Sequence, residues 1–192
     1  QGPKAWVLPM REQKGFDMNQ VITDGLNLMP PEFSEGLAIW SQEDGTPGTD
    51  TWATAGNAVL VPADQDFGTC LEILKTTTTT RIRYMTETPV LPGLYLRISV
   101  RVKALSGTLP SVRIAGWAGQ ANNSHVTGVV ETGPTVTMTS YGEVVTASAI
   151  VGIGNRGGVD MAWGEDAAYG HFGLDLTGGN GGTVRIDSLK IE

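Results

Sequence analysis

Residues 94–104, LYLRISVRVKA, identify the fold class, because apolar and polar side chains alternate along the whole stretch. A period of two places one set of side chains on each face of a β-strand, and a helix does not produce it. The apolar set is Leu94, Leu96, Ile98, Val100, Val102 and Ala104, and the polar set is Tyr95, Arg97, Ser99, Arg101 and Lys103. The stretch therefore predicts a long strand with one face in a core and one polar face.

Similar alternating runs recur along the chain, separated by Gly, Pro, Asn and Asp clusters that are typical of turns. They predict strands at residues 71–74, 81–85, 111–117, 141–151, 159–163, 169–176 and 183–191. In the last of these the apolar positions change parity after Ile186, which predicts a β-bulge at Asp187-Ser188. We expect an all-β chain that folds as an antiparallel jelly-roll β-sandwich.

The composition of the 192-residue chain agrees with a single β-domain and limits its partners. Glycine is frequent, with 26 residues, and only 17% of residues are charged, as expected of a protein with many strands and turns. No apolar run approaches the roughly 20 residues that cross a bilayer, so membrane insertion is not expected. The formal net charge of −7 argues against a nucleic-acid partner, which requires a basic surface.

Residues 1–17 are expected to lie outside the domain, which we assign to residues 18–192. Gln1-Gly2-Pro3 resembles the remnant of a cleaved tag, and residues 4–17 are polar and show no pattern. Cys70 is the single cysteine, and its place in an apolar strand predicts a buried thiol. With two histidines and one cysteine, neither a zinc site nor a Cys–His catalytic pair is expected.

Two patterns that can accompany catalysis or cofactor binding are interpreted as turns. Residues 152–157, GIGNRG, match the dinucleotide-binding pattern, but a strand follows them where that motif requires a helix. The acidic clusters at 43–44, 64–66 and 165–166 lie beside Gly or Pro and are expected to be solvated. No pair of carboxylates is assigned to acid–base chemistry, and we predict that the chain is not an enzyme.

The outward positions of the alternating strands carry many aromatic and charged side chains. Aromatic rings stack on sugar rings, while Arg, His and Asp exchange hydrogen bonds with hydroxyls, and Arg also binds the carboxylate of an acidic glycan. Tyr, Trp and Arg are also enriched in protein interfaces. This face therefore predicts either a carbohydrate ligand or a protein cover, at Tyr95, Arg97, Arg113, Trp117, Tyr169, His171 and Asp175.

Three short motifs resemble the jelly-roll carbohydrate-binding modules that accompany polysaccharide-degrading enzymes. They are Asn27-Leu28-Met29-Pro30 with Phe33, Gly36 and Trp40, then Pro92-Gly93-Leu94-Tyr95, and Val184-Arg185-Ile186-Asp187-Ser188-Leu189 near the end. The resemblance implies the sandwich fold and a polysaccharide ligand. It also implies a structural calcium ion that ties the first and last strands together, with candidate oxygen ligands on Glu32, Glu35 and Asp187.

A narrower resemblance runs through Met18-Asn19, Gly25-Leu26, residues 44–48 and residues 169–175. These segments are similar to the N-terminal domain of alphaproteobacterial β-helix proteins, which are pectate-lyase-like, and to spikes of phage-like particles, including gene transfer agents. The resemblance implies attachment to capsular polysaccharide, a place outside the cell or on the surface of a virus-like particle, and a spike partner subunit or homo-oligomer.

The leading hypothesis is therefore a non-catalytic domain that binds capsular polysaccharide. The sugar is expected to stack on Trp117 and a tyrosine, with hydrogen bonds from Arg97, Arg113, His171 and Asp175. A competing hypothesis is a structural or oligomerisation module that packs its polar face against a partner and buries Trp117. Two further hypotheses are an accessory module of a polysaccharide lyase or hydrolase, and a domain that itself cleaves polysaccharide.

Overall fold

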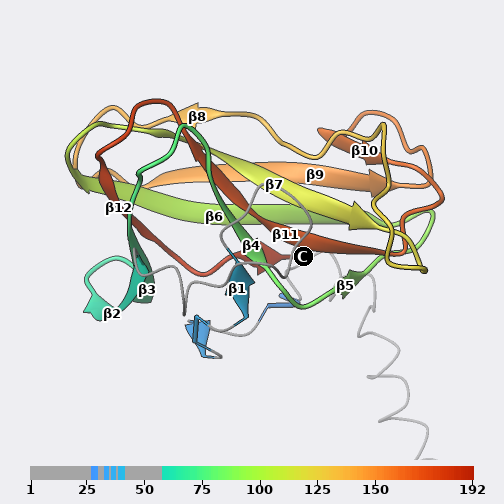
Figure 1. Ribbon diagram of the computed structural model, residues 1–192, viewed down its shortest axis with the longest axis horizontal. Coiled ribbons are helices and arrows are strands. Elements are labelled where there is room, and N and C mark those ends of the chain that lie inside the picture. Colours follow the sequence, from blue (N-terminus) through green and yellow to red (C-terminus); the bar gives the residue numbers. More distant parts are fainter. Residues whose placement is uncertain (1–26, 30–32, 35, 38, 42–57) are drawn as a thin grey trace, which may run out of the picture.

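The computed structural model describes residues 27–29, 33–34, 36–37, 39–41 and 58–192. Their strands form two sheets that face each other across one core, and Figure 1 shows β4, β7 and β11 of one sheet crossing β6 and β9 of the other. This confirms the all-β sandwich expected from the alternating runs. The boundary predicted between residues 17 and 18 lies outside the described residues. Among the residues that are described, no helix has the length and apolar character to cross a membrane.

The first sheet, called sheet A, has β11 and β7 at its centre. The described strands lie in the order β1 (Trp40–Ser41), β4 (Thr80–Tyr84), β11 (Tyr169–Thr177), β7 (Ser111–Gly119) and β8 (Val136–Thr137), and β5 (Thr88–Pro89) also pairs with β11. All of these pairs are antiparallel. Sheet A thus joins strands from distant parts of the sequence, as β11 lies between β4 and β7.

The second sheet, called sheet B, is built around the long strand β6. Its order is β10 (Met161–Trp163), β9 (Val145–Ile153), β6 (Tyr95–Ser106), β12 (Thr183–Ile186), β3 (Gly68–Leu74) and β2 (Ala58–Asp64), and β13 (Lys190–Ile191) also pairs with β6. Only the β9–β10 pair is parallel among the described strands of this sheet. Figure 1 shows the β2–β3 hairpin at one end of the long axis and β10 at the other.

The core confirms the predicted inward side chains of the three clearest strands. Ile98, Val102 and Ile114 are fully buried, and so is Phe172 on β11. The ring of Trp163 from sheet B stacks on Phe172 from sheet A, with the centroids 5.3 Å apart. The period-two alternation therefore identified the core face of each of these strands correctly.

The predicted phase change near the C-terminus is a break between two strands. β12 ends at Ile186, β13 begins at Lys190, and both pair with β6. Asp187 still donates its backbone N–H to the carbonyl of Arg101, after which the chain leaves the ladder. Leu189 is 1% exposed and returns to the core. The bulge shifts the side chains after Asp187 by one position, as its parity in the sequence predicted.

Two predictions about the strands need correction and one is confirmed. The chain forms β2 at Ala58–Asp64, which the sequence analysis did not predict, because Pro62 and the acidic residues after it interrupt the pattern. The strand expected at 141–151 begins later, at Val145. The glycine-rich segment after β9 is a turn that leads into strand β10, and Gly154 and Gly158 have the positive φ angles of 78° and 73° that glycine tolerates.

One polar side chain in the fold has no counterpart in the sequence analysis. Lys75 is fully buried at the end of β3, and burial lowers the pKa of its ammonium group. Its Nζ donates to the carbonyl oxygens of Thr77 and Gly178 and to Oδ1 of Asn180, at 2.6, 2.9 and 2.6 Å. This oxygen cage joins the turn after β3 to the turn after β11.

Candidate functional site

The seven side chains predicted to bind a ligand lie on both outer surfaces of the sandwich, which corrects the expectation of a single polar face. Strands β6 and β7 follow one another in sequence but belong to opposite sheets. The same alternation therefore points their polar side chains in opposite directions. Sheet A carries Arg113, Trp117, Tyr169, His171 and Asp175, and sheet B carries Tyr95 and Arg97. One sugar chain cannot contact Arg97 and Trp117 across a single face.

The register of β7 and β11 brings the sheet A residues together. Trp117 lies opposite His171, and Arg113 lies opposite Asp175. Tyr169 lies opposite Gly119, where a Cβ atom would collide with the tyrosine ring. The absence of a side chain at position 119 thus lets the Tyr169 ring lie across β7.

Four rings form what we call the aromatic cluster, which consists of Trp117, His125, Tyr169 and His171. The Trp117 and His125 rings are stacked, with centroids 5.0 Å apart and planes 10° apart. The Trp117 centroid lies 6.0 Å from that of Tyr169 and 5.8 Å from that of His171. Burial raises the pKa of Tyr169, and the charge of Glu87 adds to this effect. Trp117 is only 4% exposed, so the accessible ring of the cluster is His125.

His125 is held in place by Glu131 from the same loop. Its Nε2 lies 2.7 Å from Oε1 of Glu131, while Oε2 of Glu131 accepts the backbone N–H of Ala118 on β7. The sequence analysis missed both residues, because loop residues follow no period and the two are separated by an irregular segment. The only local signal is the Asn122–Ser124 turn before His125, in which Asn122 caps the backbone of Ser124.

A second set of sheet A residues is ionic. Both oxygens of the fully buried Asp175 are engaged: Arg81 Nε lies 2.5 Å from Oδ1, Arg81 NH2 lies 2.8 Å from Oδ2, and Arg113 Nε lies 2.9 Å from Oδ2. Asp175 therefore fixes two guanidinium groups in this structure, and Arg113 is the more exposed of them. His171 is also buried, with Nδ1 lying 3.1 Å from the carbonyl oxygen of Tyr84.

The two predicted residues on sheet B are exposed and lie near the first end of β6. The guanidinium carbon of Arg156 lies 4.4 Å from the centre of the Tyr95 ring. Arg97 pairs with Glu192 at 2.6 Å between NH2 and Oε2. These contacts leave Tyr95 accessible but already covered on one ring face by a cation.

The other end of sheet B holds an ion cluster, which we define as Asp64, Asp66, Glu72, Lys103 and Arg185. Asp64 was expected to be solvated, yet it is 7% exposed and accepts hydrogen bonds from Lys103 Nζ at 2.9 Å and Arg185 NH1 at 2.8 Å. Burial alone would raise the pKa of Asp64, but these bonds and two from backbone N–H groups hold it well below its usual range. The cluster fastens the β2–β3 hairpin to β6 and β12.

Of the three calcium ligands implied by the resemblance, the structure describes only Asp187. Glu32 and Glu35 lie outside the described residues. Both oxygens of Asp187 are engaged, since Oδ2 accepts two bonds from Arg101 and Oδ1 accepts the N–H of Ser188. Within the described ranges, no group of three or more His, Cys, Asp or Glu side chains is placed to hold a metal ion. A calcium ion bound to Oδ2 of Asp187 would have to displace Arg101, and the calcium site stays a prediction.

Cys70 is a structural residue, as its position in the strand predicted. It is fully buried in β3. Burial raises the pKa of its thiol to about 11, with a further contribution from the Asp64 charge.

No protein-family model and no curated protein matches the sequence. Several solved structures nevertheless have a similar sandwich fold. The C-terminal family 22 carbohydrate-binding module of Clostridium thermocellum xylanase 10B superposes with a TM-score of 0.56 and 10% identity, over 86% of this chain and 91% of that module. A structure of the N-terminal CBM22-1 and GH10 modules of the same xylanase, complexed with xylohexaose, gives the same TM-score and identity. This chain spans only 28% of that second chain.

A phage protein has the same architecture. The enzymatically active domain of tailspike protein 4 from bacteriophage CBA120 matches 86% of this chain with a TM-score of 0.52 and 13% identity. This chain spans 21% of that structure. The chain therefore has the fold of a carbohydrate-binding module, at low sequence identity.

Proposed function

We propose that this chain is a non-catalytic domain that binds a cell-surface, capsular polysaccharide through the outer face of sheet A. The observation that carries the proposal is the exposed His125 ring, which is stacked on Trp117 and lies 2.7 Å from the Glu131 carboxylate. A flat ring beside a hydrogen-bonding group is what a pyranose requires, because the ring packs on its C–H face and the carboxylate accepts from its hydroxyls. The shared fold with xylan-binding modules supports the same ligand class.

In this proposal the sheet A residues have different roles. His125 and Glu131 contact the sugar directly, and Trp117 supports the imidazole from beneath. Arg113 extends the surface along β7 with its partly exposed guanidinium group, which Asp175 orients. Tyr169 and His171 are buried and hold the position of Trp117. Tyr95 and Arg97 belong to the other surface and do not share this site.

The biological setting that we propose is a spike of a phage-like particle or gene transfer agent, with the domain acting outside the producing cell. The tailspike match supports this setting. A shallow surface site gives weak binding, of roughly micromolar to millimolar dissociation constant, because sugar hydroxyls lose water before they bind protein. Several copies in one spike would strengthen attachment through avidity.

The test is calorimetric titration of the whole chain with purified capsular polysaccharide, and with xylan and a neutral glucan for comparison, each with and without calcium. We expect selective binding that His125→Ala weakens at least tenfold without lowering the melting temperature. Tyr95→Ala is the matched control, since it removes an exposed aromatic ring from sheet B. If Tyr95→Ala weakens binding and His125→Ala does not, the site is not on sheet A. Absence of binding to every glycan at millimolar sugar would overturn the function itself.

A structural module is the second candidate, because the partly exposed Arg113 on sheet A is of a residue type that is enriched in protein interfaces. Side chains of this kind can serve assembly instead of ligand binding. This function predicts a stable oligomer in light scattering, no glycan binding, and dissociation of the oligomer in the His125→Ala variant. A monomer that binds glycan would exclude it.

A further inference from the structure

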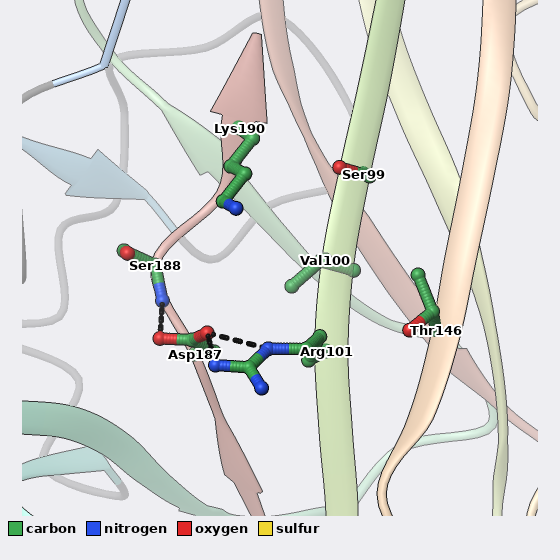
Figure 2. A pocket seen from close by; sticks show the side chains of 7 residues that line it. All are labelled: Ser99, Val100, Arg101, Thr146, Asp187, Ser188 and Lys190. Atoms are coloured by element: carbon green, nitrogen blue, oxygen red, sulfur yellow. Dashed lines mark hydrogen bonds and ion pairs between the residues drawn. The ribbon is translucent and has the colours of Figure 1, made fainter. Parts of the chain in front are cut away.

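A small polar pocket lies on the outer face of sheet B, on the surface opposite the aromatic cluster. Its volume is about 130 Å³, and it lies between β6, β9 and the segment that joins β12 to β13 (Figure 2). Its lining residues are Ser99, Val100, Arg101, Thr146, Asp187, Ser188 and Lys190. The function proposed above makes no use of this pocket.

The break in the last strand creates the pocket. After Asp187 the chain leaves β6 and returns to it only at Lys190, which pairs with Ser99. In this interval the chain lies off the β6 ladder, and the hollow beside it is lined by Ser99 and Arg101 from β6 and by Asp187 and Ser188 from the returning segment. Bulges commonly occur beside functional sites because they redirect side chains in this way.

The charges around the pocket are not balanced. The Arg101 guanidinium is fixed by Asp187, whose Oδ2 accepts from Nε at 3.0 Å and from NH2 at 2.8 Å. Lys190 forms no ion pair with any residue that the structure describes. Figure 2 shows its amine pointing from β13 toward the Asp187–Arg101 pair. Within the described part of the chain, one cation at the pocket therefore has no anion of its own.

Hydroxyl groups provide further donors. The side chains of Ser99, Thr146 and Ser188 line the pocket, and their hydroxyls make no hydrogen bond to other described residues. A site with an ammonium group that is free to pair, an oriented guanidinium and uncommitted hydroxyls matches the needs of a carboxylate, which only accepts hydrogen bonds.

We propose that this pocket binds the carboxylate of an acidic sugar, namely a uronic acid residue. Lys190 supplies the charge, the N–H groups of Arg101 that neither Asp187 nor the Asp66 carbonyl uses donate to the carboxylate, and the hydroxyls bind the sugar ring oxygens. A neutral hexose leaves Lys190 without a partner and binds more weakly. The inference rests on the proposed function and deepens it, because it makes the polysaccharide acidic and gives the domain a second contact on its other surface.

The experiment is a titration of the isotope-labelled whole chain with sodium glucuronate, followed by amide NMR at constant ionic strength. Glucose is the matched neutral sugar, and acetate is the matched carboxylate without a sugar. We expect saturable shifts for Arg101, Ser188 and Thr146 with glucuronate, and at least tenfold weaker binding of glucose and acetate. Lys190→Gln should weaken glucuronate binding about tenfold, the effect of one charge-assisted hydrogen bond. Arg156→Gln, which removes a charge beside Tyr95 at the start of β6, should leave it unchanged.

Equal binding of acetate or glucose, or equal weakening by Arg156→Gln and Lys190→Gln, would overturn the assignment. The two proposals fail separately. If the polysaccharide binds through His125 but glucuronate shifts no pocket amide, only the pocket assignment is wrong. If glucuronate binds the pocket but no polysaccharide binds the domain, the function proposed for sheet A is wrong.

Discussion

The outer faces of the two sheets carry similar residue types but organise them differently. On sheet A, one buried carboxylate fixes two arginines, and the aromatic cluster beside them ends in the exposed His125 ring. On sheet B, five charged residues form an ion cluster that fastens a hairpin, and the polar pocket holds a lysine with no ion pair to any described residue. Outward Arg, Asp and aromatic residues therefore do not define a ligand site until their partners and burial are known.

The largest effect is expected from breaking the ion cluster of sheet B. Asp64→Asn removes the negative charge that faces two cations, the buried Lys103 and the partly buried Arg185. Leaving these cations without their partner should lower the free energy of unfolding by about 3 to 5 kcal/mol. Urea denaturation measures the change. Asp66→Asn is the control, because its side chain is 40% exposed and the variant should lose well under half as much.

The equivalent change on sheet A should cost less. Asp175→Asn leaves Arg81 and Arg113 facing an amide, but both guanidinium groups reach solvent in part. We expect the free energy of unfolding to fall by about 2 to 3 kcal/mol, the value of charged hydrogen bonds at a buried acceptor. The same urea experiment tests this. If Asp175→Asn lowered the free energy of unfolding more than Asp64→Asn does, the expected order of the two substitutions would be wrong.

The smallest expected effect is the contribution of Asp64 on sheet B to the pH dependence of the free energy of unfolding. The pKa of Asp64 lies below its ordinary value of 3.8, so its stabilising contribution is complete above pH 3.8 and is lost as the pH falls toward the pKa of the folded state. While it titrates, one such group changes the free energy of unfolding by at most about 1.4 kcal/mol per pH unit. We expect wild-type stability to fall more steeply below pH 3.8 than that of Asp64→Asn, as measured by urea midpoints from pH 5 to pH 2. Parallel curves for the two proteins would contradict this assignment.

The fold could be predicted from the sequence because each strand of a β-sandwich shows a local alternation of apolar and polar residues. The inward sets of residues 94–104, 111–117 and 169–176 are core residues, and the parity change after Ile186 marks a real break in the strand. Strand β2 was missed because its pattern is interrupted at Pro62.

The site was harder to predict, because sheet membership depends on contacts between distant segments. The alternation identified Arg113 and Trp117 as outward, but it could not show that β6 and β7 face away from each other. His125 and Glu131 lie in a loop without period, and only the folded register of β7 reveals their place. The burial of Asp64 depends on Lys103 and Arg185, which are far from it in the chain.

The oxygen cage around Lys75 joins two turns without a bound ion. Three oxygens from two separate turns converge on one ammonium group, which is the arrangement that many extracellular proteins achieve with a bound ion. Here the positive charge is covalently attached to the chain. A chelator cannot extract it, dilution cannot dissociate it, and its occupancy does not vary with the salt content of the medium. The junction between these two turns therefore does not depend on a dissociable ion.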